Sequence, residues 1–264
     1  MAKVLIILDD GHGMDTPGKR TPPMPGTGKP IQENEFNRPV VDKLEKLFTS
    51  CGFEVLQTAP EINNVSLDIR TNRANQAYKQ FKKDNPSGLS VFVSIHYNAI
   101  KDTFEASNAE GVETFHYPGS AEGSILAKAI HKELMGGTPQ KDRGVKSANF
   151  HVLRETLMPA VLVEAGFMDH LPEAKLMLDP AFQNEVALEL FEGVRKYLAG
   201  KGVSIMGKDV ASDWAKGAQD WAIKSGLSDG SRPKDTVTRE ELWVIAQRVQ
   251  ESTIKAIIEA LSKQ

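Results

Sequence analysis

The sequence is poor in cysteine, in long apolar runs and in net charge, and each shortage excludes a class of protein. Its 264 residues include one cysteine, Cys51, which cannot form an internal disulfide and which we expect to be a buried thiol after an apolar helix. The N-terminal segment has an apolar core of five residues, whereas a secretory signal needs about 7–15 and a membrane span about 18. The net charge of −3 is too small to favour nucleic-acid binding. We therefore expect a globular protein, made in the cytoplasm, that binds neither membranes nor nucleic acid.

Several common catalytic motifs are also missing. There is no HExxH pair of histidines and no phosphate-binding loop with its lysine. The stretch GHGMDTPG does not fit a dinucleotide fingerprint, because Asp15 and Thr16 stand where further glycines are required. Cys51 has no base near it in the sequence, so a thiol nucleophile is not expected.

The sequence does contain an alternation of strand and helix patterns. Five mostly apolar stretches read as strands: 3–9, 53–58, 91–97, 111–117 and 160–166. Apolar residues spaced by three and four predict helices over 35–50, 121–135 and 180–198, and Pro39 is tolerable in the first turn of the first helix. This alternation predicts an α/β fold with a mainly parallel twisted sheet, covered by helices on both faces.

The composition changes near residue 200. All three tryptophans, Trp214, Trp221 and Trp243, fall after this point, and a glycine-containing stretch precedes them. We therefore expect a main domain at 1–199, a linker at 200–208 and a small helical domain at 209–264.

Residues suited to metal chemistry follow the predicted strands. His12 comes just after the first strand, His96 ends the third and Glu164 ends the last. The carboxyl ends of parallel strands meet at one edge of a sheet, so we expect these side chains to lie close together. Glu33 and Glu35 open the first helix, and the loop before it can fold back over the strand ends. Two histidines and a carboxylate form a common zinc set that leaves one position for water, and a further carboxylate could act as general base.

Each residue taken alone has a simpler interpretation. A single loop histidine more often bonds to solvent or protein than to a metal, and Glu33 could be an ordinary carboxylate at a helix N-terminus. Glu164 is harder to explain in this way, because a carboxylate after a buried strand needs a partner or a function. We expect the other histidines to be structural and keep His151 as a candidate substrate contact. These histidines are His116, His131, His151 and His170.

Four stretches, in this order, resemble the zinc-dependent N-acetylmuramoyl-L-alanine amidases of the amidase 3 family. They are DDGHGMD, ENEFN before an apolar helix, SIHYNA and MPAVLVEAGFMDH. The resemblance implies that His12, Glu33 and His96 bind one zinc ion and that Glu164 is the catalytic carboxylate. The family has an asparagine four residues after its glutamate. Asn37 gives Glu33 this spacing, so Glu35 is kept only as the fallback ligand.

The same resemblance implies a substrate and a reaction. The substrate is bacterial peptidoglycan, and the bond is the amide between N-acetylmuramic acid and L-alanine of the stem peptide. Asp10 and Asp15 are candidates for orienting His12 from behind. The sequence departs from the family at Asp10, where proline is common, and in the long loop 16–32, which we expect to shape the substrate groove.

The biological role has several interpretations. An enzyme that acts on the wall without an export signal must be released by another route, which favours a phage or prophage endolysin. A lytic enzyme of the mother cell is the alternative within this class. A zinc peptidase that cuts within the stem peptide also stays open, as does a non-catalytic wall-binding protein on the same fold, although Glu164 argues against the latter.

The C-terminal stretch 209–249 is similar to one surface-layer-homology repeat. The matching features are the opening Asp-Val, Trp214, GLSDG and VTREE. The resemblance implies that this domain binds a secondary cell-wall polysaccharide through Thr238, Arg239 and Glu240. Such repeats usually occur in threes, so a small helical appendage is the alternative. Apolar residues at helical spacing over 254–261 also leave a homo-oligomer open.

Overall fold

The computed structural model describes residues 3–138, 140–203 and 249. The chain divides into two compact units, Met1–Ile205 and Met206–Gln264. All the helices and strands reported below belong to the first unit. The expected C-terminal domain, with Thr238, Arg239 and Glu240, lies outside the described residues.

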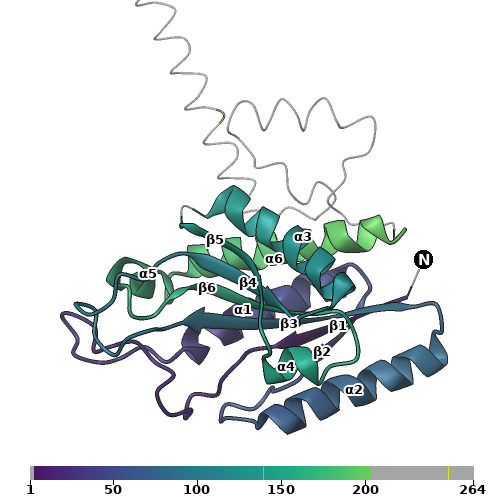
Figure 1. Cartoon of the computed structure of the whole chain (residues 1–264), viewed down its shortest axis with the longest axis horizontal. Helices are drawn as coiled ribbons and strands as arrows, with labels where there is room; N and C mark the ends of the chain where they lie inside the picture. The colour runs from purple at the N-terminus through teal and green to yellow at the C-terminus, as the bar shows by residue number, and fades with distance from the viewer. Residues whose placement is uncertain (1–2, 139, 204–248, 250–264) are drawn as a thin grey trace, which may run out of the picture. The chain divides into compact units, whose positions relative to one another are not determined.

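The first unit is built on one six-stranded sheet with the order β2-β1-β3-β6-β4-β5 (Figure 1). The strands are β1 Val4–Asp9, β2 Glu54–Gln57, β3 Leu89–Asn98, β4 Val112–His116, β5 Asp142–Ser147 and β6 Ala160–Phe167. Neighbouring strands are parallel, except that β4 and β6 are antiparallel. The predicted α/β fold with a mainly parallel sheet is confirmed.

Helices cover both faces of this sheet. They are α1 Asn34–Ser50, α2 Leu67–Asp84, α3 Ala121–Gly137, α4 His151–Arg154, α5 Leu171–Leu176 and α6 Pro180–Gly200. One face carries α1, α3 and α6, and the other carries α2 and α4 (Figure 1). In the part of the chain that the structure describes, no helix has the length and apolar character needed to cross a membrane.

Alternate side chains of each strand enter two separate cores, as the period of two in a strand requires. In β1, Ile6 and Leu8 belong to the large core under α1, α3 and α6. Leu5 and Ile7 belong to the smaller core under α2 and α4. This alternation determines which face each residue at the end of a strand points to.

Four elements do not show in the sequence pattern: β5, α2 and the short helices α4 and α5. β5 is an edge strand with the sequence DRGVKS, and no residue in it is fully buried, so it gives no apolar signal. α2 buries Arg70 and Thr71 beside Ala74 and Phe81. Its inward stripe is therefore half polar, and the apolar periodicity that predicts a surface helix is weak.

The end of the first unit also differs from the expectation. α6 continues to Gly200, and Val203 is still buried in the large core. The first residues of the expected linker at 200–208 therefore belong to the compact unit. Cys51, expected to be buried, is only partly buried where α1 ends.

Pro39 lies in the second turn of α1 rather than in the first, because the helix begins at Asn34. A proline has no N–H, so the carbonyl of Glu35 loses its donor within the helix. Gln183 on α6 replaces that donor, with its Nε2 donating to the Glu35 carbonyl oxygen at 3.3 Å. The proline is thus accommodated by the helix packed against it.

Candidate metal centre and catalytic site

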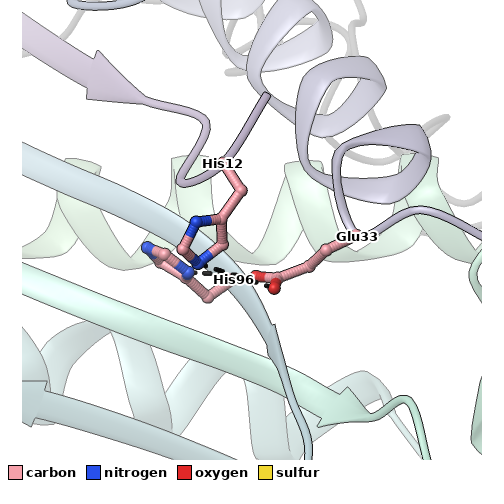
Figure 2. Close-up of side chains that lie close together, drawn as sticks. All are labelled: His12, Glu33 and His96. Atoms are coloured by element: carbon pink, nitrogen blue, oxygen red, sulfur yellow. Dashed lines mark hydrogen bonds and ion pairs between the residues drawn. The ribbon is translucent and has the colours of Figure 1, made fainter. Parts of the chain in front are cut away.

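His12, Glu33 and His96 come together at the carboxyl edge of the sheet (Figure 2). His12 lies in the loop after β1, Glu33 is the N-cap residue of α1, and His96 lies in β3. One nitrogen or oxygen atom from each residue lies within 4.8 Å of the others. The rings of the two histidines meet edge to face, with 5.0 Å between their centroids. The three residues that the sequence suggested as ligands therefore share one site.

The glycines on both sides of His12 are required by close contacts. Gly11 has a φ of +67°, and a Cβ on it would lie 2.6 Å from Cε1 of His96. A Cβ on Gly13 would lie 2.1 Å from the backbone nitrogen of Asn64. Only residues without a side chain let this turn pass between β3 and the 63–64 backbone.

The loop 16–32 returns to the sheet and places Glu33. Thr21 and Ile31 pair across it, with the Thr21 N–H donating to the Ile31 carbonyl at 2.8 Å and the Ile31 N–H donating to Thr21 Oγ1 at 2.9 Å. The Glu33 N–H then donates to the Lys19 carbonyl at 2.9 Å. These bonds close the loop just before α1, so the Glu33 side chain reaches the strand ends.

The two carboxylate oxygens of Glu33 differ. Oε1 lies 3.0 Å from Nδ1 of His96 and accepts hydrogen bonds from the Tyr97 N–H at 3.1 Å and from Nδ2 of Asn37 at 3.2 Å. Oε2 is buried, has no hydrogen-bond partner and lies 3.6 Å from Nε2 of His12. A buried carboxylate oxygen without a partner is costly unless a cation binds to it.

The protonation of His12 and Glu33 suits metal binding. Burial lowers the pKa of His12 to about 4, against the attraction of Glu33. Burial alone would raise the pKa of Glu33, but the hydrogen bond and charge of His96 outweigh it and hold that pKa at about 2. A neutral imidazole and an ionised carboxylate are the forms that bind metals. His96 differs, because burial alone would lower its pKa but the hydrogen bond and charge of Glu33 outweigh burial and raise that pKa, so it has to release a proton when a metal binds.

A chain of buried polar residues holds the imidazole of His96 through Nε2, the nitrogen that does not face Glu33. Nε2 of His96 lies 3.1 Å from Oγ of Ser94, and that hydroxyl donates to Oδ2 of Asp9 at 2.6 Å. The other oxygen of Asp9 pairs with Arg70 at 2.9 Å, and Arg70 is 1% exposed. These residues were not predicted from the sequence. The serine and the aspartate read only as strand residues, and Arg70 comes from a helix that the pattern did not predict.

Glu164 lies beside His96 on the same face of the sheet. The two residues are paired in the register of β6 and β3, and each alternates with residues of the large core. One oxygen, Oε2, is buried without a hydrogen-bond partner. Burial raises the pKa of Glu164 to about 8, against the attraction of His96. A carboxyl group with a pKa near neutrality is suited to accept and return a proton.

The other candidates near the site contact different groups. Asp10 pairs with Arg38 at 2.7 Å and with Arg70 at 3.1 Å. Its Oδ2 also accepts from Asn34 at 2.7 Å, and the same amide nitrogen donates to the His12 carbonyl. Asp10 thus holds the backbone of His12 through Asn34, and no hydrogen bond or ion pair among the described residues joins Asp10 to the imidazole of His12.

Asp15 and Glu35 lie outside the ligand group. Asp15 accepts from the Asn64 N–H at 2.6 Å, and Glu35 Oε2 accepts from the Gln32 N–H at 2.7 Å. The remaining histidines contact protein groups elsewhere: His116 the Tyr117 carbonyl, His131 Thr114 and Asp142, His151 Asp68, and His170 Glu110 and Glu173.

Residues 6–196 match the model of the N-acetylmuramoyl-L-alanine amidase family. The chain belongs to this family. Two relatives are similar to this chain over most of its length. The sporulation-specific N-acetylmuramoyl-L-alanine amidase of Bacillus subtilis (strain 168) is 33% identical over 187 residues, which cover 70% of this chain and 64% of the relative. The endolysin of Bacillus phage SPP1 is 31% identical over 201 residues, which cover 74% of this chain and 66% of the relative.

Solved amidase structures share the fold. The catalytic domain of the N-acetylmuramoyl-L-alanine amidase CwlV from Bacillus (Paenibacillus) polymyxa var. colistinus matches with a TM-score of 0.61 and 32% identity, over 75% of this chain and 98% of that domain. The N-acetylmuramoyl-L-alanine amidase of Clostridium difficile 630 matches with a TM-score of 0.64 and 29% identity, over 76% of this chain and 100% of that one. The chain spans less than two thirds of the curated relatives named above. The likeness therefore covers the catalytic unit.

Proposed function

We propose that the protein is a zinc-dependent N-acetylmuramoyl-L-alanine amidase. Its substrate is bacterial peptidoglycan, and it hydrolyses the amide between N-acetylmuramic acid and L-alanine of the stem peptide. The observation that carries the proposal is the group of His12, Glu33 and His96 beside Glu164, inside the segment that matches the amidase family.

The residues at this site fit a zinc ion. Two imidazole nitrogens and one carboxylate oxygen are a frequent catalytic zinc set. Oε2 of Glu33 is buried without a hydrogen-bond partner and faces His12. A cation bound between them would offset the free-energy cost of burying this oxygen. When bound, zinc supplies Lewis acidity, which polarises a carbonyl and makes water a stronger acid.

In this proposal Glu164 moves the proton. Its carboxylate takes a proton from the attacking water and later gives it to the nitrogen of the leaving alanine. Nearby positive charge would favour the ionised form of Glu164 and bring its pKa below the value of about 8 that burial gives. Tyr97 and Asn37 keep Glu33 in place by hydrogen bonds to Oε1.

The test is a digestion of purified peptidoglycan followed by mass spectrometry. An amidase releases intact stem peptides with a free alanine N-terminus and leaves glycan chains with a free lactyl carboxylate. A zinc peptidase would instead leave alanine attached to the glycan, and a non-catalytic wall-binding protein would release nothing. Glu164→Gln, which keeps the size of the side chain, is the matched control and should release the same products about 10²–10⁴ times more slowly.

We further propose a lytic role of the endolysin type. The likeness to the endolysin of Bacillus phage SPP1 supports it, although the sporulation-specific amidase is similar to the same degree. The protein would be made in the cytoplasm and reach the wall after release. Expression in a bacterial host should leave the cells intact until a pore-forming protein is induced. Lysis without the pore would contradict this role.

The C-terminal segment 209–264 is proposed to hold the enzyme on the wall by binding a secondary cell-wall polysaccharide. The support is the sequence motif that contains Thr238, Arg239 and Glu240, since arginine can bind an anionic sugar group with two hydrogen bonds. In the full chain carrying Glu164→Gln, which binds without cutting, Arg239→Ala should release the protein from sedimented walls. Equal sedimentation of both proteins would remove Arg239 from this role.

A further inference from the structure

The face of the sheet that carries His96 and Glu164 continues into a second group of charges. Glu113 on β4 is paired in register with Glu164, and both residues alternate with members of the large core, so both point to the α2 face. Beyond Glu113 lies the edge strand β5, which carries Arg143 and Lys146. Polar side chains therefore run from β3 across β6 and β4 to the edge of the sheet.

Glu113 is buried, and a cation holds each of its oxygens. Nε of Arg143 donates to Oε1 at 2.6 Å, and Nζ of Lys146 donates to Oε2 at 2.5 Å. The Glu113 side chain is 5% exposed, whereas those of Arg143 and Lys146 are 27% and 39% exposed. One carboxylate is thus matched by two cations, and a net positive charge reaches solvent beside Glu164.

Aromatic rings hold both cations in position, and hydrogen-bond donors remain that Glu113 does not use. The guanidinium of Arg143 lies 4.8 Å above the centroid of the Phe167 ring, and Nζ of Lys146 lies 6.0 Å from that of Phe115. Lys146 uses only one of its three N–H groups on Glu113. A charged pair fixed in this way loses little side-chain entropy when it binds an anion.

The place of this pair relative to the reaction indicates what it binds. Neighbouring strands lie about 4.8 Å apart, so β5 lies roughly 10 Å from β6, where Glu164 stands. That distance corresponds to a few bonds beyond the amide that the proposed function assigns to this site. The N-acetylated sugars on one side of that amide carry no charge, whereas the peptide on the other side carries carboxylates.

We propose that Arg143 and Lys146 form a carboxylate-binding subsite for the stem peptide, which places the peptide over β4 and β5 and the glycan on the side of His12. The inference rests on the proposed amidase function. Glu113 is the residue that positions both cations, and one cation alone would have been enough to neutralise it.

The test uses two muropeptide fragments that differ in one group. Each carries N-acetylmuramoyl-L-alanyl-D-glutamate with the γ-carboxyl capped as a methylamide, and the α-group is either a free carboxylate or a carboxamide. The wild-type enzyme should cleave the carboxylate fragment with a kcat/KM roughly tenfold higher, through KM, since a hydrogen bond to a charged group is lost with the carboxamide. Equal kcat/KM values for the two fragments would overturn the subsite.

The variants separate recognition from folding. Lys146→Met keeps the aliphatic stem and leaves Glu113 paired with Arg143, so the fold should persist, and it should reduce the preference for the carboxylate. Lys146→Arg should restore that preference. Lys141→Met removes a lysine that is 62% exposed and pairs with Glu110, and it should change nothing. A Lys146→Met enzyme that keeps the full preference would show that the pair serves only Glu113.

Binding gives a readout that does not depend on turnover. In the Glu164→Gln background, calorimetry should show tighter binding of the carboxylate fragment than of the carboxamide, and Lys146→Met should remove the difference. If the wild-type enzyme cleaves neither fragment at the lactyl amide while this difference in binding persists, the proposed reaction fails and the subsite stands. If cleavage occurs without any discrimination, the subsite fails and the reaction stands.

Discussion

The two faces of the sheet are made from the same strands but differ in composition at the carboxyl edge. Under α1, α3 and α6 the alternate residues of β1, β3 and β6 are apolar from one end to the other, as Ile6, Ile95 and Val163 illustrate. Under α2 and α4 the apolar residues stop before the carboxyl edge, and His96, Glu164 and their polar neighbours follow. One face forms the large apolar core, and the other places the residues of the candidate site at the carboxyl edge of the sheet.

The polar end of the second face is stable because its charges are paired. Asp9 bonds to Arg70, Ser94 and Thr58, and Glu113 bonds to Arg143 and Lys146. Two carboxylate oxygens, Oε2 of Glu33 and Oε2 of Glu164, are left without partners there. The exceptions to pairing therefore coincide with the groups to which the proposed chemistry assigns a task. Substitutions on the apolar face should therefore reduce stability, whereas substitutions at the polar end should reduce activity or metal binding.

The largest effect is expected at Glu164. Glu164→Gln keeps the shape of the side chain and removes the base, so the rate should fall by about 10²–10⁴. Metal content and melting temperature should change little. The measurement is the steady-state rate on muropeptides together with metal analysis and thermal unfolding. Turnover near that of the wild type would remove Glu164 from the mechanism.

On the apolar face, Leu190→Ala should cost stability and leave the site intact. Leu190 is fully buried in α6, and replacing a buried leucine by alanine typically costs about 2–5 kcal/mol. Leu188→Ala on the same helix is the control, because Leu188 is 38% exposed and such surface changes stay within about 0.5 kcal/mol. Urea unfolding of the three proteins gives the comparison. Equal midpoints for both variants would contradict the assignment of this face.

A smaller effect is expected from the support behind His96. Ser94→Ala breaks the link between Nε2 of His96 and Asp9, and loss of such a partner weakens metal binding by about 10–100-fold. Ser90 points to the same face of the same strand and its hydroxyl has no hydrogen-bond partner, so Ser90→Ala should leave the affinity unchanged. Competition with a chromogenic chelator measures both. An unchanged affinity in Ser94→Ala would show that this chain of residues is only structural.

The smallest effect concerns a carboxylate far from the site, Glu189 on α6. Burial raises its pKa to about 8, with repulsion from Glu185 and Glu133, and neither of its oxygens has a hydrogen-bond partner. As pH rises from its ordinary pKa of 4.5 towards 8, the unfolded chain loses this proton and the folded chain keeps it, so folding stability falls. Glu189→Gln should therefore raise the melting temperature at pH 8 and have less effect at pH 5.

Glu192 on the same helix provides the opposite control. The hydrogen bond to Arg195 lowers its pKa, so its contribution to stability is present at neutral pH and is lost in acid. Glu192→Gln should lower the melting temperature at pH 8 rather than raise it. A Glu189→Gln protein with the same gain at pH 5 and pH 8 would contradict the protonation assigned to Glu189.

The sequence predicted the parts of the site that follow a strong local signal. His12, His96 and Glu164 stand directly at or after apolar strands, so the meeting of parallel strand ends places them at one edge. Asp9 and Ser94 gave no signal, because their partners lie 61 and 85 residues away in the chain. β5 gave none either, since an edge strand of polar residues has no apolar alternation. Pairings of this kind depend on the tertiary structure, and one sequence does not encode them in a local pattern.

The account depends most directly on the metal that His12, Glu33 and His96 are proposed to hold. Metal analysis by mass spectrometry should find about one zinc per chain in the wild-type protein and in Glu35→Ala, and almost none in Glu33→Ala. Removal of the metal by a chelator should abolish hydrolysis, and added zinc should restore it. Zinc retained in Glu33→Ala but lost in Glu35→Ala, or full activity of the metal-free protein, would contradict the account.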